Sequence, residues 1–209
     1  MSALGSESLH YPAHALSPRQ ACDLELILNG GFSPLAGFMD RRNYERILDG
    51  MRLVDGSVWP IPIALDVPES LAERLEAGGR LALQDDEGFT LAVLDAQEIW
   101  QPDKRREAEA VYGTSSKEHP GVRALFEDVH DHYVGGRIGI QLPMHPDYEE
   151  LRNTPAELRR SFGKLGWWRI VGFHSFAWIR RIRARCSGSG DLFVSVAGGV
   201  LGPGSIFGQ

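Results

Sequence analysis

The chain has 209 residues, 43% of them hydrophobic and 24% charged, which is enough for one well-buried core or for one domain and the start of a second. Its formal net charge of -6 argues against general nucleic-acid binders, which neutralise phosphate with an excess of Lys and Arg. Small molecules or other proteins are therefore the expected partners.

The cysteines and the apolar runs indicate a cytoplasmic protein. Cys22 and Cys186 lie far apart in the sequence, and two such residues form neither a disulfide framework nor a clustered zinc site. No apolar run has the length of a bilayer span, and the N-terminal residues lack the basic and then apolar layout of a signal peptide. We expect no membrane segment and no metal site.

The first helices are marked by capping residues. Ser17 and Gln20 form a capping box, with Pro18 at the first helical position, and this pattern predicts a helix over residues 17–28. Asp40 is the expected N-cap of a second helix, which we expect to run through residue 48 and to end before a glycine.

The next segments indicate strands. Residues 58–67 are rich in β-formers, but Pro60 and Pro62 cannot donate to a ladder, which predicts an edge strand or a barrel corner. Residues 68–77 are expected to form a short helix. Alternating apolar residues on either side of an acidic, glycine-containing turn predict a β-hairpin within residues 81–93.

The rest of the patterned region alternates irregularly between strands and helices. We expect a strand over residues 133–142 and a buried strand over residues 167–173. Helices are expected over residues 103–112, 120–127 and 155–165. This order predicts an α+β domain built on a small sheet or barrel.

The composition changes at about residue 175. Residues 176–209 contain four Arg and one Asp, a charge of +3, so residues 1–175 carry -9. The Arg residues are followed by a stretch rich in Gly and Ser, which is typical of irregular backbone. We therefore treat residues 176–209 as a divergent tail.

A series of short segments resembles the ATP sulfurylases, also called sulfate adenylyltransferases, in content and in order. The segments are Ser17-Pro18-Arg19-Gln20, Asp23-Leu24-Glu25-Leu26, Leu28-Asn29-Gly30-Gly31-Phe32-Ser33-Pro34-Leu35, Gly37-Phe38-Met39, Tyr112-Gly113-Thr114, His119-Pro120-Gly121-Val122, Tyr133-Val134-Gly135-Gly136, Gln141-Leu142-Pro143, Leu151-Arg152-Asn153-Thr154-Pro155-Ala156-Glu157-Leu158-Arg159 and Gly166-Trp167-Trp168-Arg169-Ile170-Val171-Gly172-Phe173. Together they span residues 17–173, and so many segments in the family order make the resemblance specific.

The resemblance implies a PUA-like N-terminal domain over residues 1–165 and, at residues 166–175, the first strand of an α/β nucleotidyltransferase domain. It also implies the family reaction, in which Mg-ATP and sulfate give adenylyl sulfate and pyrophosphate. That reaction needs cationic and backbone donors to hold two anions together and to stabilise the leaving pyrophosphate. Mg-ATP is then a substrate of the full-length family, and we expect no cofactor bound by this chain.

The nucleotide-binding motif of the family is missing. Members continue the strand with Gln or His and then Thr-Arg-Asn-Pro, followed by an H-x-x-H pair. Here His174 and Ser175 remain as candidate substrate-binding residues, whereas Phe176, Ala177 and Trp178 stand where Arg, Asn and Pro are expected. No H-x-x-H follows, so we expect no catalytic residue in this chain.

Two explanations of the tail stay open. One is a truncated sulfurylase gene with a frameshift, because 34 residues after position 175 are too few for an α/β domain, which takes on the order of 100. The other is a non-catalytic module retained for binding or oligomerisation, with RNA binding disfavoured by the acidity. The composition of the tail favours the first. Expected partners are a second copy of the chain or the missing catalytic domain.

Four histidines lie near acidic residues and could suggest a metal site; they are His119, His130, His132 and His145. A solvated surface connection is the expected setting, because His130 and His132 alternate with acids in a segment without periodicity.

Two further groups have plain structural interpretations. Trp167 and Trp168 could stack on a base, but their apolar neighbours predict core or interdomain packing. Arg19, Asp23 and Glu25 share one helix at near-helical spacings, which predicts a salt-bridged surface.

Overall fold

The computed structural model describes residues 11–141, 153–166, 195–196 and 199–200. Six strands among them form one sheet in the order β1-β4-β5-β6-β2, and β3 also pairs with β6. The strands are β1 (Ala13–Ala15), β2 (Gly37–Phe38), β3 (Leu65–Val67), β4 (Arg80–Gln84), β5 (Thr90–Trp100) and β6 (His132–Gln141). β1 is parallel to β4 and the other pairs are antiparallel.

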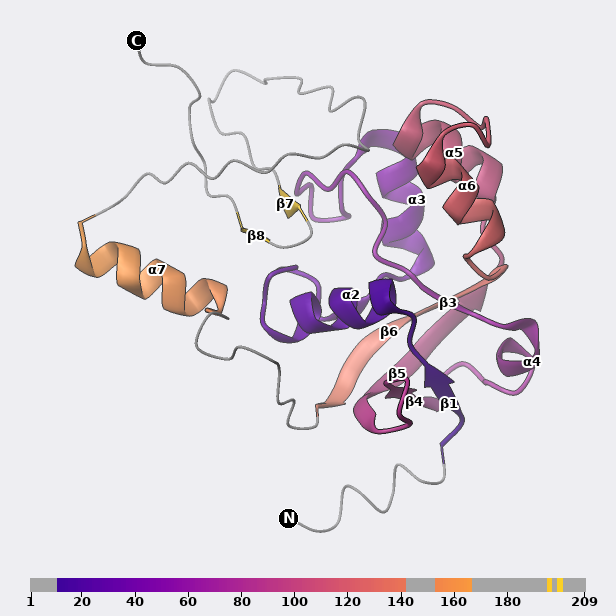
Figure 1. Ribbon diagram of the computed structural model, residues 1–209, viewed down its shortest axis with the longest axis horizontal. Helices are drawn as coiled ribbons and strands as arrows, with labels where there is room; N and C mark the ends of the chain where they lie inside the picture. The colour runs from indigo at the N-terminus through magenta and orange to yellow at the C-terminus, as the bar shows by residue number, and fades with distance from the viewer. Residues whose placement is uncertain (1–10, 142–152, 167–194, 197–198, 201–209) are drawn as a thin grey trace.

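The helices surround this sheet. They are α2 (Pro18–Leu28), α3 (Arg41–Gly50), α4 (Glu69–Ala72), α5 (Lys104–Tyr112), α6 (Pro120–Glu127) and α7 (Pro155–Lys164). Figure 1 shows α2 across the front of β6, with α3, α5 and α6 grouped at one end and α7 apart from the sheet. The mixed α+β class is confirmed, whereas the predicted strand over residues 167–173 lies outside the described residues. A separate two-stranded ladder joins β7 (Ser195–Val196) to β8 (Gly199–Val200).

Helix α2 forms as its capping signals predict. The Ser17 hydroxyl accepts from the Gln20 N–H at 3.3 Å, and the Gln20 side-chain oxygen accepts from the Ser17 N–H at 2.9 Å. These two bonds satisfy donors that the first turn of a helix leaves free. The helix ends at Leu28, and Gly30 follows with a φ of 81°.

Helix α3 runs two residues further than expected. Asp40 caps it by accepting from the Asn43 N–H at 2.8 Å. The left-handed residue at the end is Met51, with a φ of 52°, and not the glycine before it. Two backbone hydrogen bonds of 2.8 Å hold Met51 there, one to the Ile47 carbonyl and one from the Trp59 N–H. Tertiary contacts thus set this end of the helix.

The segment between α3 and β4 differs most from the prediction. Of residues 58–67, expected to form an edge strand or a barrel corner, only Leu65–Val67 pair as β3. Pro60 and Pro62 precede it and cannot donate to a ladder, and before them Val58 makes only an isolated antiparallel bridge with Arg52. The helix expected over residues 68–77 shortens to the single turn α4.

The later elements agree with the sequence signals. The predicted hairpin is β4 and β5, and its turn holds Gly88 at a φ of 86°. Helices α5 and α6 begin at caps formed by Asp103 and His119. Helix α7 begins with a second capping box, between Thr154 and Glu157.

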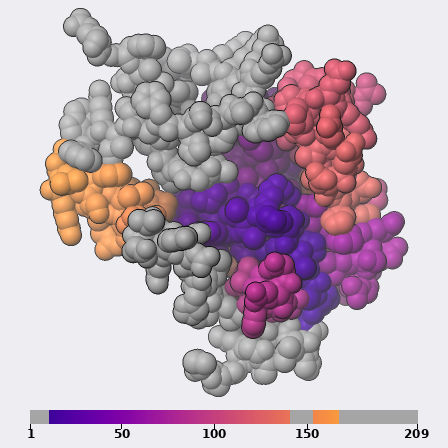
Figure 2. Space-filling view, in the orientation of Figure 1, coloured from indigo at the N-terminus to yellow at the C-terminus, as the bar shows by residue number. Residues whose placement is uncertain are grey.

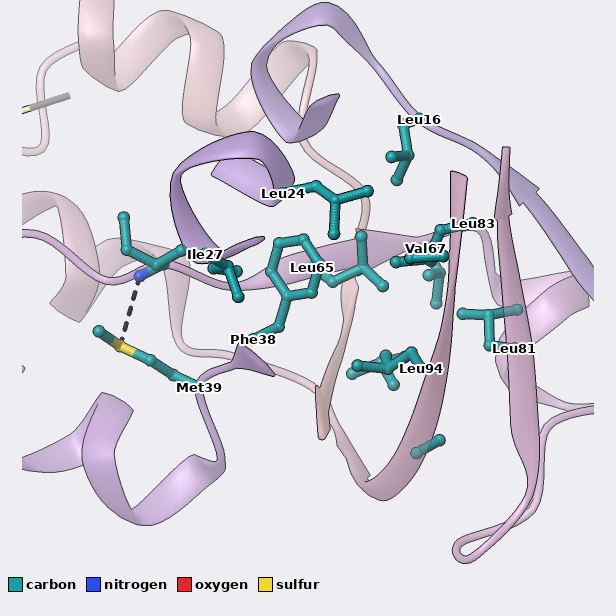
Figure 3. Packing of buried hydrophobic residues seen from close by; sticks show 14 of the residues in the cluster. Leu16, Leu24, Ile27, Phe38, Met39, Leu65, Val67, Leu81, Leu83 and Leu94 are labelled. Carbon is teal, nitrogen blue, oxygen red and sulfur yellow. Dashed lines mark hydrogen bonds between the residues drawn. The ribbon is translucent and has the colours of Figure 1, made fainter. Parts of the chain in front are cut away.

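The main core lies between α2 and the sheet. Leu24 of α2, Leu65 of β3 and Leu94 of β5 are each fully buried. Figure 3 shows these side chains packed together with those of Phe38 and Leu83, with α2 on one side and the strands on the other. Each such side chain contributes about 1.5–3 kcal/mol when it is removed from water. The position of α2 is therefore fixed in large part by apolar burial.

Glycines allow the neighbouring strands to approach the middle of β6 closely. A Cβ added at Gly37 or at Gly136 would meet a backbone carbonyl oxygen, that of Gly136 and that of Asp95 respectively. A Cβ at Gly135 would lie 2.5 Å from the Met39 carbonyl oxygen. The Gly135-Gly136 pair of β6 permits this approach.

We predict that Gly136→Ala lowers the free energy of unfolding by about 3 kcal/mol, because a methyl group must displace backbone and not a flexible side chain. Urea denaturation followed by tryptophan fluorescence measures the change. Gly50→Ala is the matched control: nothing lies within 4 Å of its added Cβ, and we expect at most a small gain in stability. Equal urea midpoints of unfolding for Gly136→Ala and the wild type would contradict the close approach of β5 to Gly136.

Candidate functional site

The candidate substrate-binding residues His174 and Ser175 lie outside the described residues, as do Trp167, Trp168 and Cys186. The described part of the chain instead contains two buried polar clusters. The first is centred on Asp66 of β3, and the second on Glu107 of α5. Sequence patterns singled out neither carboxylate.

Asp66 joins three segments that are distant in sequence. Its Oδ1 accepts from the Arg19 guanidinium at 2.6 Å and from the Gln20 amide at 2.8 Å. Its Oδ2 accepts from the backbone N–H of His130 at 3.0 Å. The residue is 4% exposed, so both oxygens have exchanged water for protein donors.

Arg19 bridges two carboxylates at the start of α2. Besides Asp66, its guanidinium donates to Asp23 Oδ2 at 3.0 Å. The predicted ion pair is thus present, but the expectation of a surface position is wrong for Asp23, which is 7% exposed. The signal was available, because Asp23 shares the helical phase of the buried residues Gln20, Leu24 and Ile27. In Figure 2 the residues at the start of the described chain, in indigo, lie in the middle of the visible face of the molecule.

Gln20 completes the first cluster. Its amide nitrogen donates to the carbonyl oxygen and to Oδ1 of Asp66, both at 2.8 Å. Its oxygen lies 3.2 Å from Nε2 of His14, which is buried in β1. The cluster therefore connects β1, α2, β3 and the approach to β6, and these contacts serve to hold the elements together.

Burial changes the protonation of this cluster. Desolvation raises the pKa of Asp23 to about 6, although the neighbouring Arg19 opposes the shift. Desolvation also lowers the pKa of His14, outweighing its hydrogen bond with Gln20 and the nearby charge of Asp66. At neutral pH we therefore expect an uncharged His14 beside an ionised Asp23.

The second cluster buries Glu107 against aromatic residues. Its Oε2 accepts from the Tyr44 hydroxyl at 2.9 Å and from the Tyr133 hydroxyl at 3.0 Å. The Trp100 ring centroid lies 5.8 Å from each tyrosine ring, and its buried Nε1 has no protein partner. Burial raises the pKa of Glu107 despite the two phenol donors. The cluster packs α3 and α5 against the ends of β5 and β6.

The histidines are used in the structure in separate ways. His119 caps α6 by accepting from the Gly121 N–H at 3.2 Å, and His132 Nε2 lies 2.9 Å from the Gln101 side-chain nitrogen. His145 lies outside the described residues. Within the described residues, no group of three or more His, Cys, Asp or Glu side chains could hold a metal ion. None of the described helices has the length and apolar character to cross a membrane.

The fold and the sequence define the class of this domain. The profile of the PUA-like domain family matches residues 1–141, which include the whole six-stranded sheet and both clusters. The chain belongs to the PUA-like domain family.

The sequence relatives of the chain belong to a narrower group of proteins than the domain family. The chain is 41% identical over 198 residues to the sulfate adenylyltransferase of Saccharomyces cerevisiae, a match that covers 91% of this chain and 39% of the relative. It is also 41% identical over 216 residues to that of Aspergillus clavatus, covering 97% and 37%. The chain thus spans less than two-fifths of these relatives. Both matches extend past residue 175, since residues 1–175 are about five-sixths of the chain.

A solved structure shares the fold. The hexameric APS kinase from Thiobacillus denitrificans superposes with a TM-score of 0.58 and 34% sequence identity, covering 79% of this chain and 29% of that one. The predicted resemblance to sulfate adenylyltransferases with a PUA-like domain is confirmed by the family profile and the sequence relatives.

We predict that Asp66→Ala lowers the free energy of unfolding by about 3–5 kcal/mol, because it leaves the donors of Arg19, Gln20 and His130 without their acceptor. Glu109→Ala removes a carboxylate from an exposed ion pair with Arg105 and should change stability by less than about 1 kcal/mol. Denaturant titration of both variants measures the contrast. Equal losses in the two variants would show that Asp66 does not hold the domain together.

A second prediction concerns pH. Because the pKa of Asp23 is raised by folding to about 6, the folded state binds its proton more tightly, and this residue destabilises the fold as pH rises from about 4 to about 6. Asp23→Asn should therefore gain stability relative to the wild type across that window. Subtracting the free energies of unfolding of the two proteins at each pH removes the contributions of His14 and Glu107, which both proteins share. A difference independent of pH would contradict the shift.

Proposed function

We propose that the chain is the N-terminal PUA-like part of a sulfate adenylyltransferase, the enzyme class that forms adenylyl sulfate and pyrophosphate from ATP and sulfate. We propose further that this chain does not catalyse the reaction by itself. The observation that carries the proposal is the 41% identity to sulfate adenylyltransferases within 37–39% of their length.

The described residues support a scaffolding role over an anion-binding one. Sulfate and triphosphate require donors and positive charge that are free to meet them. Residues 11–141 contain 22 acidic and 13 basic side chains. Arg19, which is half-exposed, already binds two buried carboxylates, and Lys104 donates to the Val129 carbonyl and to Asp131. A second anion would have to break these contacts.

Residues 174–178 carry the second part of the proposal. His174 and Ser175 remain as a remnant of the substrate-binding motif, but Phe176, Ala177 and Trp178 provide no cation and no turn-forming Asn-Pro. Apolar side chains cannot neutralise the charge that develops on a departing pyrophosphate. The proposed loss of activity therefore follows from the residue types at these positions. Because the sequence matches extend into the tail, the reading frames of the gene across codons 170–209 separate a diverged continuation from an out-of-frame one.

A second candidate function is a non-catalytic oligomerisation module. It is favoured by the solved structure with the same fold, which is described as hexameric. Light scattering of the purified chain tests this, and a single mass of 23.1 kDa at all concentrations would contradict it. The excess of acidic residues disfavours RNA as a partner.

For the main proposal, we expect no sulfate-dependent release of pyrophosphate from Mg-ATP above an enzyme-free blank. A coupled pyrophosphate assay measures this, with the sulfate adenylyltransferase of Saccharomyces cerevisiae as the positive control. A rate that depends on sulfate and rises in proportion to the concentration of this chain would contradict it.

A further inference from the structure

Helices α5 and α6 form a helical hairpin between two paired strands. The chain leaves the sheet after Trp100 of β5 and returns to it at β6, where Tyr133 is the direct partner of Trp100. The backbone hydrogen bonds of residues 103–129 all lie within that range. The hairpin can therefore separate from the sheet without breaking a strand pair.

The hairpin has a hydrophobic cluster of its own. Ala108 of α5 is buried against Val122 and Leu125 of α6, and the half-buried rings of Tyr112 and Phe126 pack on them. Of the described residues that form the main core, none comes from α5 or α6. Figure 1 shows the two helices side by side at one end of the molecule, and in Figure 2 they project at the upper right. The two helices therefore depend on each other for packing more than on the main core.

The contact of α5 with the rest of the domain is polar and aromatic. Glu107 is 8% exposed, and its Oε2 accepts from the hydroxyls of Tyr44 and Tyr133 at 2.9 and 3.0 Å. Trp100 packs against both rings, and its buried Nε1 donor has no hydrogen-bond partner in the described part of the chain. Burying a carboxyl group and an unpaired indole N–H costs free energy that apolar packing does not. We call these four side chains the seam, and it is a weaker junction than the main core.

The other side-chain bonds of the hairpin add little across the seam. Arg106 of α5 forms ion pairs with Glu45 and Asp49 of α3, but its side chain is 42% exposed, so water and salt screen them. Lys104 donates to two groups in the connection from α6 to β6, and these bonds do not cross the seam. The two phenol hydrogen bonds to Glu107 are therefore the main polar hold on the hairpin.

We propose that the α5–α6 hairpin opens from the sheet as one cooperative unit, and that Glu107 is the latch that keeps it closed. In the open form Glu107 regains water, and the rings of Tyr44, Trp100 and Tyr133 become an exposed aromatic surface on α3 and the strand ends. The strand pairing and the main core stay intact. The proposal does not depend on any role in sulfate activation, because it rests only on the packing around the hairpin.

Hydrogen–deuterium exchange of the full chain, followed by mass spectrometry, tests the opening. Helices of nine and eight residues are too short to stay folded when detached, so their amides exchange in the open form. We expect α5 and α6 to exchange together and faster than β4 and β5. Tyr44→Phe removes one phenol donor and should raise exchange in both helices by about tenfold. Tyr112→Phe is the matched control, because that hydroxyl makes no hydrogen bond with the described residues, and exchange should stay unchanged.

Two further variants separate local opening from a general loss of stability. Tyr133→Phe removes the other donor, which comes from β6 instead of α3, and should have the same effect as Tyr44→Phe. Ile27→Val in the main core should raise exchange in β4 and β5 by about fivefold. It should leave α5 and α6 unchanged, because the core stays closed when the hairpin opens.

Three results would overturn the proposal. The first is exchange of α5 and α6 at the rate of β4 and β5 in the wild type. The second is an equal response of helices and strands to Ile27→Val, since the hairpin and the sheet would then unfold together. The third is unchanged exchange in both Tyr44→Phe and Tyr133→Phe, which would remove Glu107 as the latch.

Discussion

One buried carboxylate, that of Asp66, connects parts of the domain that are far apart in the sequence. Its donors come from Arg19 and Gln20 at the start of α2 and from the backbone of His130 before β6. Burying a charge is costly unless donors replace the lost water, and these donors supply that replacement. They also position α2 over the sheet, where Leu24 and its neighbours close the core. The capping box determines where α2 begins, the polar contacts with Asp66 hold that end of the helix against β3, and apolar burial stabilises it there.

The charged groups of these buried clusters already have partners within the domain, which limits what the described residues can bind. Arg19 donates to Asp23 and Asp66, Lys104 donates to Val129 and Asp131 in the segment between α6 and β6, and Glu107 accepts from two tyrosines. Within the described ranges these groups are committed to holding elements together. A domain organised in this way can present and orient a neighbouring site, which is consistent with a PUA-like domain whose sequence relatives are much longer enzymes.

The sequence predicts those features that depend on near neighbours. Ser17, Asp40 and Thr154 mark helix starts correctly, because a cap bonds to a backbone amide three residues away. Residues 58–67 contain less strand than expected, because pairing there depends on the distant β6 and Pro60 and Pro62 cannot donate to it. The Asp66 and Glu107 clusters were missed for a similar reason: their partners are 46 to 64 and 26 to 63 residues away. Such contacts leave no local pattern, although the helical phase of Asp23 was readable.

Helix α7 lies between the family profile and the residues at which we propose that the substrate motif is lost. The family profile ends at residue 141, and α7 lies beyond it with a capping box at its start and a left-handed glycine at its end. Both signals are local, so the two ends of this helix are specified by residues within or next to it. The loss of the substrate motif that we propose begins about ten residues after Gly166, at Phe176. Under that proposal the chain keeps the helix that precedes the substrate motif of the family and lacks the charged residues of the motif itself.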